Sequence, residues 1–237
     1  MQQNINIFKS PDKIRKSFIL HIKEAINKAT LIKDEFNLDD LHNIFIDEKT
    51  LLKKGTDQAT LFHKAIYSTF NHANYFSTDF WDSYRVLCLE VVNKLKIDTG
   101  YFGDWAIQRY PTIRVQFPNN LSVFEFHRDS DYSHPIGEIN CFYAVNECFN
   151  SSALQVEKNL GFEDYEPLNL KSGEYAILNT SIFKHGDLLN KTRRTRVSMD
   201  FRFIPEKKLI DSKSSLTKSI KFSSDSYFVK EKEIVNL

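Results

Sequence analysis

The stretch Arg196-Val197-Ser198-Met199-Asp200-Phe201-Arg202-Phe203 alternates between polar and apolar side chains over its whole length. Such a period of two is typical of a β-strand whose two faces meet different surroundings. We expect the apolar set to face a helical layer and the polar set to face the interior of a β structure. A planar guanidinium in that interior can make a two-pronged contact with a carboxylate.

The residues around this stretch belong to a β-rich half of the chain. After about residue 104, short runs rich in Val, Ile, Phe and Tyr alternate with polar residues and turn formers. These runs predict strands near residues 106–117, 121–128, 137–146, 152–157, 174–179 and 193–204. Short, closely spaced strands favour a sandwich or a jelly roll over a parallel sheet with crossover helices.

The first part of the chain has helical periodicity instead. Ser10-Pro11-Asp12 is typical of a helix start, and apolar residues then recur on one helical face as far as Ala29. We expect a second helix to begin at Asp57-Gln58 and a third at Thr78-Asp79. Helices followed by strands predict an α+β fold in which the helices pack on one outer face of the β core.

Length and composition predict one domain with an appended tail. A chain of 237 residues is long enough to bury a substantial core. We assign residues 1–205 to a single domain, with a mainly helical layer over 1–103 and the β core with the site over 104–205. Residues 206–237 are rich in Lys and Ser, with few large apolar side chains before Tyr227, so we expect a loosely attached tail there.

The charge balance bears on the partners of the protein. The chain has 31 acidic and 32 basic residues, so no global field would draw it to nucleic acid or to an anionic membrane. No apolar run reaches the roughly 18 residues of a membrane-spanning helix, and none resembles a signal peptide, so we expect a soluble, cytoplasmic protein. The three cysteines have no Cys-x-x-Cys spacing, which argues against a disulfide framework and a structural zinc site.

Three residues of the β half form a candidate metal site. His127 and Asp129 lie two residues apart at a predicted strand end, so alternation puts them on one face. Alone, such a pair is more often an ordinary polar loop contact. His185 follows a predicted strand and turn 58 residues after His127, as though facing the pair across the mouth of a barrel. Two imidazoles and one carboxylate form the facial triad that selects Fe(II) and leaves positions open for oxygen chemistry.

Arg196 and Ser198 complete the candidate site. Arg196 lies 11 residues after His185, and its guanidinium would point into the interior, where Ser198 could add a further hydrogen bond. This arrangement would hold the distal carboxylate of a diacid whose 2-oxo acid end chelates iron. The expected ligands are therefore Fe(II) and a 2-oxo diacid. Arg202 points the same way and is expected to form an ion pair with Asp200.

The order and spacing of His127-x-Asp129, His185 and Arg196-x-Ser198 resemble the 2-oxoglutarate-dependent Fe(II) oxygenase superfamily. Over residues 104–205 the chain more narrowly resembles the StrG-like oxygenases found among carbohydrate and aminoglycoside biosynthesis proteins. The segments that carry this narrower resemblance are Pro111-Thr112-Ile113-Arg114, the run from His127 to His134, Gly137-Glu138-Ile139-Asn140, Leu154-Gln155-Val156-Glu157, His185-Gly186, Asn190 and the run from Arg196 to Arg202.

The resemblance implies both a fold and a reaction. The β core would be a distorted double-stranded β-helix, a cupin-like jelly roll. 2-Oxoglutarate would be converted to succinate and CO2 while a sugar-, aminocyclitol- or amino-acid-like molecule is oxidised. Superfamily members that halogenate have lost the ligand carboxylate, whereas Asp129 is present. The resemblance therefore implies a hydroxylase, with desaturation or cyclisation as less frequent outcomes.

Other polar residues of the β half are candidates for binding the co-substrate or the substrate. Arg114 and Asn140 interrupt apolar strands, and we assign them to the co-substrate. We assign five further residues to the substrate: Gln108, Gln116, Tyr132, His134 and Glu157. Plainer interpretations stay open: the wet face of an edge strand for Arg114 and its neighbours, an orienting contact behind the ligands for Asn140 and Glu157, and a loop carbonyl contact for His134.

Three other functions share some of these features. A nucleic-acid demethylase of the AlkB type carries a similar triad and an Arg-x5-Arg pattern, matched by Arg196 and Arg202, but the balanced charge and the shorter spacing from His185 argue against it. A non-catalytic, cupin-like metal- or small-molecule-binding protein would leave Arg196 and Ser198 without a role. The third alternative is a small-molecule sensor that keeps the barrel without turnover.

Overall fold

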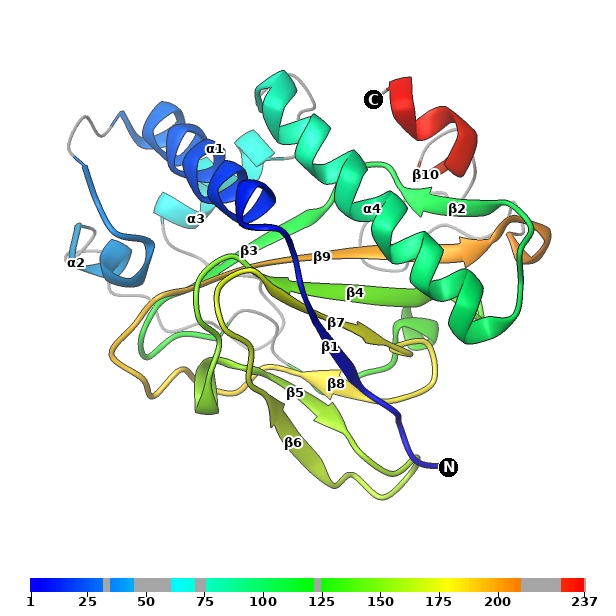
Figure 1. Cartoon of the computed structure of the whole chain (residues 1–237). Coiled ribbons are helices and arrows are strands. Elements are labelled where there is room, and N and C mark those ends of the chain that lie inside the picture. The colour runs from blue at the N-terminus through cyan, green and yellow to red at the C-terminus, as the bar shows by residue number, and fades with distance from the viewer. Residues whose placement is uncertain (32–34, 45–60, 71–75, 122–124, 210–226, 237) are drawn as a thin grey trace.

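The computed structural model describes residues 1–31, 35–44, 61–70, 76–121, 125–209 and 227–236, and its strands form two antiparallel sheets (Figure 1). The larger sheet runs in the order β1 (Asn6–Lys9), β7 (Glu174–Leu178), β4 (Ile139–Ala144), β9 (Arg196–Pro205), β2 (Trp105–Gln108) and β10 (Phe228–Lys230), and β3 (Thr112–Gln116) also pairs with β9. The smaller sheet runs in the order β6 (Tyr165–Leu168), β5 (Leu154–Glu157) and β8 (His185–Gly186).

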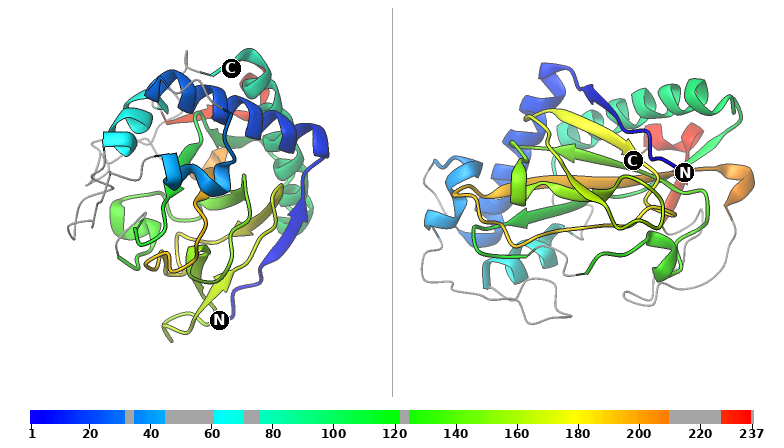
Figure 2. Two further views of the ribbon diagram at one scale, coloured as in Figure 1. Left: turned by 90° about the vertical axis from the view of Figure 1, so that its left-hand side faces the viewer. Right: turned by 90° about the horizontal axis from the view of Figure 1, so that it is seen from below.

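Helices cover the side of the large sheet that faces away from the small sheet (Figures 1 and 2). They are α1 (Asp12–Thr30), α3 (Leu61–Phe70) and α4 (Thr78–Thr99), whereas the short α2 (Leu41–Ile44) lies at one end of the molecule. The starts of α1 and α4 agree with the predicted ones, and Ser77 caps α4 by accepting a hydrogen bond from the Phe80 amide. The predicted start at Asp57-Gln58 lies outside the described residues. Among the helices that the structure describes, none is both long and apolar enough to cross a membrane.

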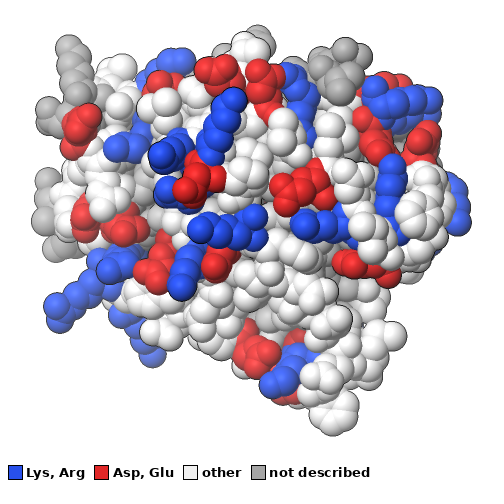
Figure 3. All heavy atoms as spheres, in the orientation of Figure 1, with Lys and Arg blue, Asp and Glu red and all other residues white. Residues whose placement is uncertain are grey.

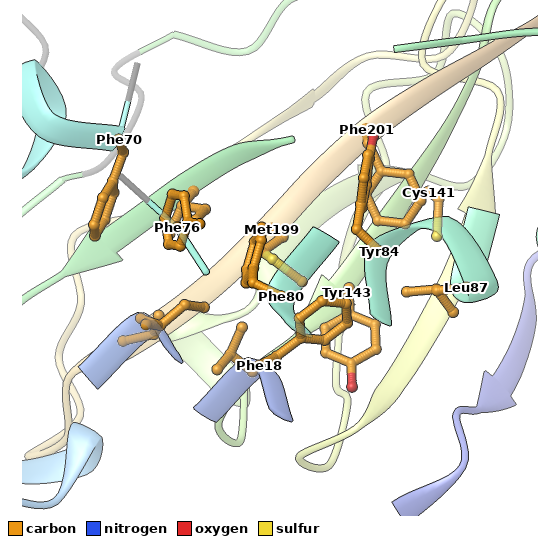
Figure 4. Close-up of a cluster of buried hydrophobic side chains, with 14 of the residues drawn as sticks. Phe18, Phe70, Phe76, Phe80, Tyr84, Leu87, Cys141, Tyr143, Met199 and Phe201 are labelled. Carbon is orange, nitrogen blue, oxygen red and sulfur yellow. The ribbon is translucent and has the colours of Figure 1, made fainter. Parts of the chain in front are cut away.

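The two faces of β9 meet different surroundings, as the alternation predicted. Its apolar side chains are fully buried against the helical layer: Val197, Met199, Phe201 and Phe203. In this layer Phe18 of α1 packs edge-on against Tyr143, and Tyr84 of α4 packs edge-on against Phe201, each with ring centroids 5.2 Å apart (Figure 4). A second apolar cluster, which includes Phe142, Val156 and Leu178, lies between the sheets. The predicted jelly-roll core with helices on one outer face is confirmed.

Several strands differ from the predicted ones. Residues 106–117 form two strands, β2 and β3, separated near Pro111, which has no backbone N–H for a strand ladder. Of the predicted strand 121–128, residues 122–124 lie outside the described part, and His127 makes only an isolated bridge. The strands β1, β6 and β8 were not predicted. All three are short and lie at sheet edges, so their sequences carry a weak signal.

The prediction of a loosely attached tail is wrong for residues 227–236. β10 pairs with β2 in the large sheet, and Phe228 and Ile234 are fully buried. Lys96 of α4 also forms a 2.6 Å ion pair with Glu231. A few apolar residues in a polar stretch were enough to dock this segment, because an open sheet edge supplies backbone hydrogen bonds whatever the side chains are.

His63 in α3 should make the stability of the fold depend on pH. Its side chain is fully buried, and Nε2 donates a hydrogen bond to the Val115 carbonyl at 3.1 Å. Burial lowers the pKa of His63 to about 4. Unfolded His63 takes up a proton near its ordinary pKa of about 6.5. Its contribution to stability is therefore complete above that pH and is lost as the pH falls towards 4.

Urea unfolding at pH 7.5 and pH 5 measures this effect. Between these two pH values the wild type should lose roughly 2 kcal/mol more unfolding free energy than His63→Gln, which keeps a donor but does not titrate. Equal losses in the two proteins would show that His63 is not held neutral.

Candidate metal centre

The three predicted metal ligands lie close together. One ligand atom from each of His127, Asp129 and His185 lies within 4.8 Å of the others. His127 and His185 face each other in an isolated antiparallel bridge, in which each amide donates to the other carbonyl, at 3.0 and 2.9 Å. Asp129 begins the short 3-10 turn Asp129–Tyr132 directly afterwards. This backbone pairing brings segments 58 residues apart to one point.

The two histidines can present neutral Nε2 atoms to a metal. Nδ1 of His127 donates to the Glu125 carbonyl at 2.8 Å, which fixes the proton on that nitrogen and leaves Nε2 with a lone pair. Burial lowers the pKa of His185 to about 4, so its imidazole is neutral near pH 7. The Nε2 atoms of His127 and His185 lie 3.9 and 3.7 Å from Oδ1 of Asp129.

The carboxylate of Asp129 is held from behind. Thr180 donates its hydroxyl to Oδ2 at 2.6 Å, and Arg202 places Nε 3.2 Å from Oδ2 and Nη2 3.3 Å from Oδ1. Burial by itself would raise the pKa of Asp129, but the charge and hydrogen bond of Arg202, together with His185 and His134, hold this pKa well below its usual range. Asp129 is therefore ionised. Its Oδ1 faces both histidines, which suits a ligand that binds through one oxygen.

A pocket adjoins the triad, and several predicted residues line it. The polar lining residues besides the two histidines are Arg114, Asn140, Asp187, Arg196, Asp200 and Arg202. Ser198 is buried on the same face of β9, and its hydroxyl has no hydrogen-bond partner among the described residues. The same holds for Oδ1 of Asn140. Buried polar atoms without a partner are rare in folded proteins, so these two point to a polar ligand.

Arg196 has a carboxylate partner that the sequence did not indicate. Its Nη1 and Nη2 atoms lie 2.6 and 3.1 Å from the two oxygens of Asp187, and Nη1 also donates to the Ser152 carbonyl at 2.9 Å. Burial alone would lower the pKa of Arg196, but the Asp187 charge raises it. Asp187 lies two residues after His185, which is the one signal that could have identified it.

Arg202 links the triad to four other residues. The predicted ion pair with Asp200 is present at 3.0 Å, but the contact with Asp129 was missed. Besides Asp129, the partners of Arg202 are the carboxylates of Asp200 and Glu138, the side-chain oxygen of Gln108 and the hydroxyl of Tyr227. Nδ1 of His134 lies 2.9 Å from the Glu138 carboxylate. Gln108 therefore contacts Arg202 directly, and His134 contacts it through Glu138.

The structure places the other predicted substrate residues less uniformly. The ring of Tyr132 packs edge-on against His127, with centroids 5.0 Å apart. Gln116 donates to the carbonyls of Asn120 and Leu188 and does not line the pocket. The carboxylate of Glu157 accepts hydrogen bonds from three backbone amides: those of Gly161, Glu163 and Lys184. Glu157 therefore shapes loops and is not brought to the site.

Comparison with known proteins bears out the sequence resemblance. No family model matches the chain. The chain is 28% identical over 177 residues to the streptomycin biosynthesis protein StrG of Streptomyces griseus, across 75% of this chain and 78% of that protein. The resemblance to StrG-like proteins that the motifs indicated is confirmed by this homologue.

Two solved structures are similar at lower identity. The Ni complex of the non-haem monooxygenase ThoJ has a TM-score of 0.48 and 8% identity, over 93% of this chain and 82% of that chain. The non-haem α-ketoglutarate-dependent epimerase SnoN of nogalamycin biosynthesis has a TM-score of 0.49 and 9% identity, over 86% of this chain and 79% of that chain.

Removing Asp129 should abolish metal binding. In Asp129→Ala the site would lose its only negative ligand, and the Arg202 charge would repel a cation. Anaerobic titration with Co(II), followed by its visible absorption, should show one site in the wild type and none in the variant.

Thr180→Val, which removes only the hydrogen bond that orients Oδ2, should weaken Co(II) binding roughly 10-fold or more. His21→Ala, a control on α1, should bind Co(II) like the wild type, and full occupancy in Asp129→Ala would contradict the assignment.

Proposed function

We propose that this protein is a non-haem Fe(II) enzyme that uses 2-oxoglutarate and O2 to oxidise a small molecule. The observation that carries the proposal is the convergence of His127, Asp129 and His185 within 4.8 Å beside a pocket that Arg196 also lines. Two imidazoles and one carboxylate are the donor set of non-haem Fe(II) oxygenases, and they leave coordination positions open.

The residues of the pocket fit a 2-oxo diacid. Such a ligand needs hydrogen-bond donors and positive charge at its distal carboxylate, and Arg196 and Ser198 supply both on one face of β9. The Ser198 hydroxyl has no other partner in the part of the chain that the structure describes, so it is available to donate. Arg114, which pairs with β9 at Ser198, adds a further cation at the pocket.

The protein side chains would have distinct tasks in this reaction. Bound Fe(II) would supply the redox chemistry that converts 2-oxoglutarate and O2 to succinate and CO2 while the substrate is oxidised. His127 and His185 would offer Nε2, and Thr180 and Arg202 would keep Oδ1 of Asp129 turned towards the ion. Tyr132, stacked edge-on against His127, is a candidate contact for the substrate.

We further propose that the reaction is a hydroxylation in the cytoplasm, on a sugar-, aminocyclitol- or amino-acid-like molecule. The third ligand, Asp129, is a carboxylate, so no ligand position is vacated for a halide. The name of the StrG homologue, a streptomycin biosynthesis protein, supports a role in biosynthesis and a sugar-like substrate. On the face shown in Figure 3, acidic and basic side chains are interspersed, which gives no support to the nucleic-acid demethylase alternative.

Ser198 offers a sharp test of the co-substrate. Because its hydroxyl has no partner among the described residues, Ser198→Ala should leave the unfolding free energy unchanged or slightly higher. It should weaken 2-oxoglutarate binding about 10-fold or more, since a hydrogen bond to a charged group contributes roughly 1.5–3 kcal/mol. Binding is measured anaerobically from the weak visible charge-transfer band of the Fe(II) protein on addition of 2-oxoglutarate.

A buried serine on the other side of the large sheet provides the control. Ser10 bonds to Tyr143 and to the Gly173 carbonyl, so Ser10→Ala should lower stability and leave 2-oxoglutarate binding unchanged. If the wild type gave no band with 2-oxoglutarate, the proposed function would be wrong, and a cupin-like metal-binding protein would remain. Normal 2-oxoglutarate affinity in Ser198→Ala would remove this residue from the site.

A further inference from the structure

The guanidinium that should receive the co-substrate already holds a carboxylate of the protein. Asp187 engages Arg196 with both oxygens, Oδ1 to Nη1 at 2.6 Å and Oδ2 to Nη2 at 3.1 Å. The side chains of the pair are 1% and 2% exposed, so water does not screen it. Nη1 also donates to the Ser152 carbonyl. The end of the guanidinium is thus engaged by a built-in acid in the ligand-free protein.

Asp187 lies in the same pocket as the proposed ligand. It follows β8 directly, two residues after the metal ligand His185, and it lines the pocket together with Arg196 and Asn140. A diacid bound between the triad and Arg196 would therefore bring a second carboxylate next to that of Asp187. Two carboxylates that share one guanidinium in a buried, low-dielectric site repel each other strongly.

We propose that Asp187 competes with the distal carboxylate of 2-oxoglutarate for Arg196 and thereby sets how tightly the pocket binds a diacid. The proposal rests on the proposed function. In the ligand-free protein Asp187 supplies the counter-charge without which a buried arginine would strongly destabilise the fold. In the complex the same charge opposes the ligand. Asp187 therefore stabilises the ligand-free protein and weakens diacid binding through one contact.

A different role for Asp187 would have the opposite consequence. If it only oriented Arg196, so that the ligand used another edge of the guanidinium, its removal would loosen Arg196 and weaken diacid binding. Asp187→Asn separates the two roles, because the amide keeps the shape and one acceptor oxygen for Nη1 while the negative charge is lost. The direction of the change in affinity decides between them.

The experiment compares two 2-oxo acids on the anaerobic Fe(II) protein. 2-Oxoglutarate carries the distal carboxylate, whereas 2-oxobutanoate has the same chelating end without it. In Asp187→Asn the dissociation constant of 2-oxoglutarate should fall at least 10-fold, and that of 2-oxobutanoate should change less than 3-fold. In thermal unfolding, ligand-free Asp187→Asn should melt below the wild type, and 2-oxoglutarate should raise its melting temperature by more than it raises that of the wild type.

Controls keep each failure distinguishable. Glu147→Gln removes a carboxylate from the exposed pair with Arg194, which lies outside the pocket, and should leave both dissociation constants unchanged. If Asp187→Asn does not fold, Asp187→Ser removes the same charge with less bulk and should show the same selective gain. Unchanged or weaker 2-oxoglutarate binding in the folded variant overturns the competition. Absence of 2-oxoglutarate binding in the wild type would overturn the proposed function instead.

Discussion

Paired charges buried between the two sheets constrain the rest of the structure. Arg196 and Arg202 are buried and Arg114 is half-buried, and each has an aspartate partner: Arg114 with Asp200, Arg196 with Asp187 and Arg202 with Asp129. A buried charge is tolerated only when it is paired and hydrogen-bonded, and removal of one partner leaves the other strongly destabilising. The pairs require β9 to keep its register with β3 and β4, because a slip of one residue would turn Arg196 and Arg202 towards the helices.

The two faces of β9 serve different purposes: one contributes to stability and the other lines the pocket. The outward side chains of β9 are packed in the aromatic layer under α1 and α4, where burial of apolar area contributes most of the favourable free energy. Its inward side chains contribute little apolar burial and hold Asp129 and line the pocket instead. The helical layer can therefore support an interior whose charges and unpartnered polar atoms, such as Ser198 Oγ, would be costly in a smaller fold.

How far the sequence predicted this arrangement depended on the range of each interaction. The alternation of β9 and the helical periodicity before residue 104 are local patterns, so the layer order could be predicted. The triad was predicted because the order and spacing of its residues resemble those of a known superfamily. Contacts between side chains that lie far apart in the sequence could not be predicted. Thr180 on Asp129 and Tyr227 on Arg202 depend on loops and on an edge strand whose sequence signal is weak.

Glu157 and Asp187 show where prediction from the sequence failed: one residue was assigned to the pocket and does not line it, and the other lines it and was not assigned. Both are acidic residues of the β half, and of the two only Glu157 was predicted to belong to the site. The carboxylate of Glu157 accepts hydrogen bonds from three backbone amides, whereas that of Asp187 pairs with Arg196 in the pocket. The difference arises from which face of a short strand or loop each residue occupies. That face is set by the pairing of β5 with β8.

The paired interior also explains why the metal ligands and the proposed anion site belong in one pocket. Each of the three arginines faces an aspartate. A divalent cation at the triad would add two positive charges to a low-dielectric region, and a diacid near Arg196 would add two negative ones. These charges are equal and opposite, so each ligand would offset the charge that the other adds. The electrostatics therefore couple the two sites, and a pocket that binds one of these ligands is suited to bind the other beside it.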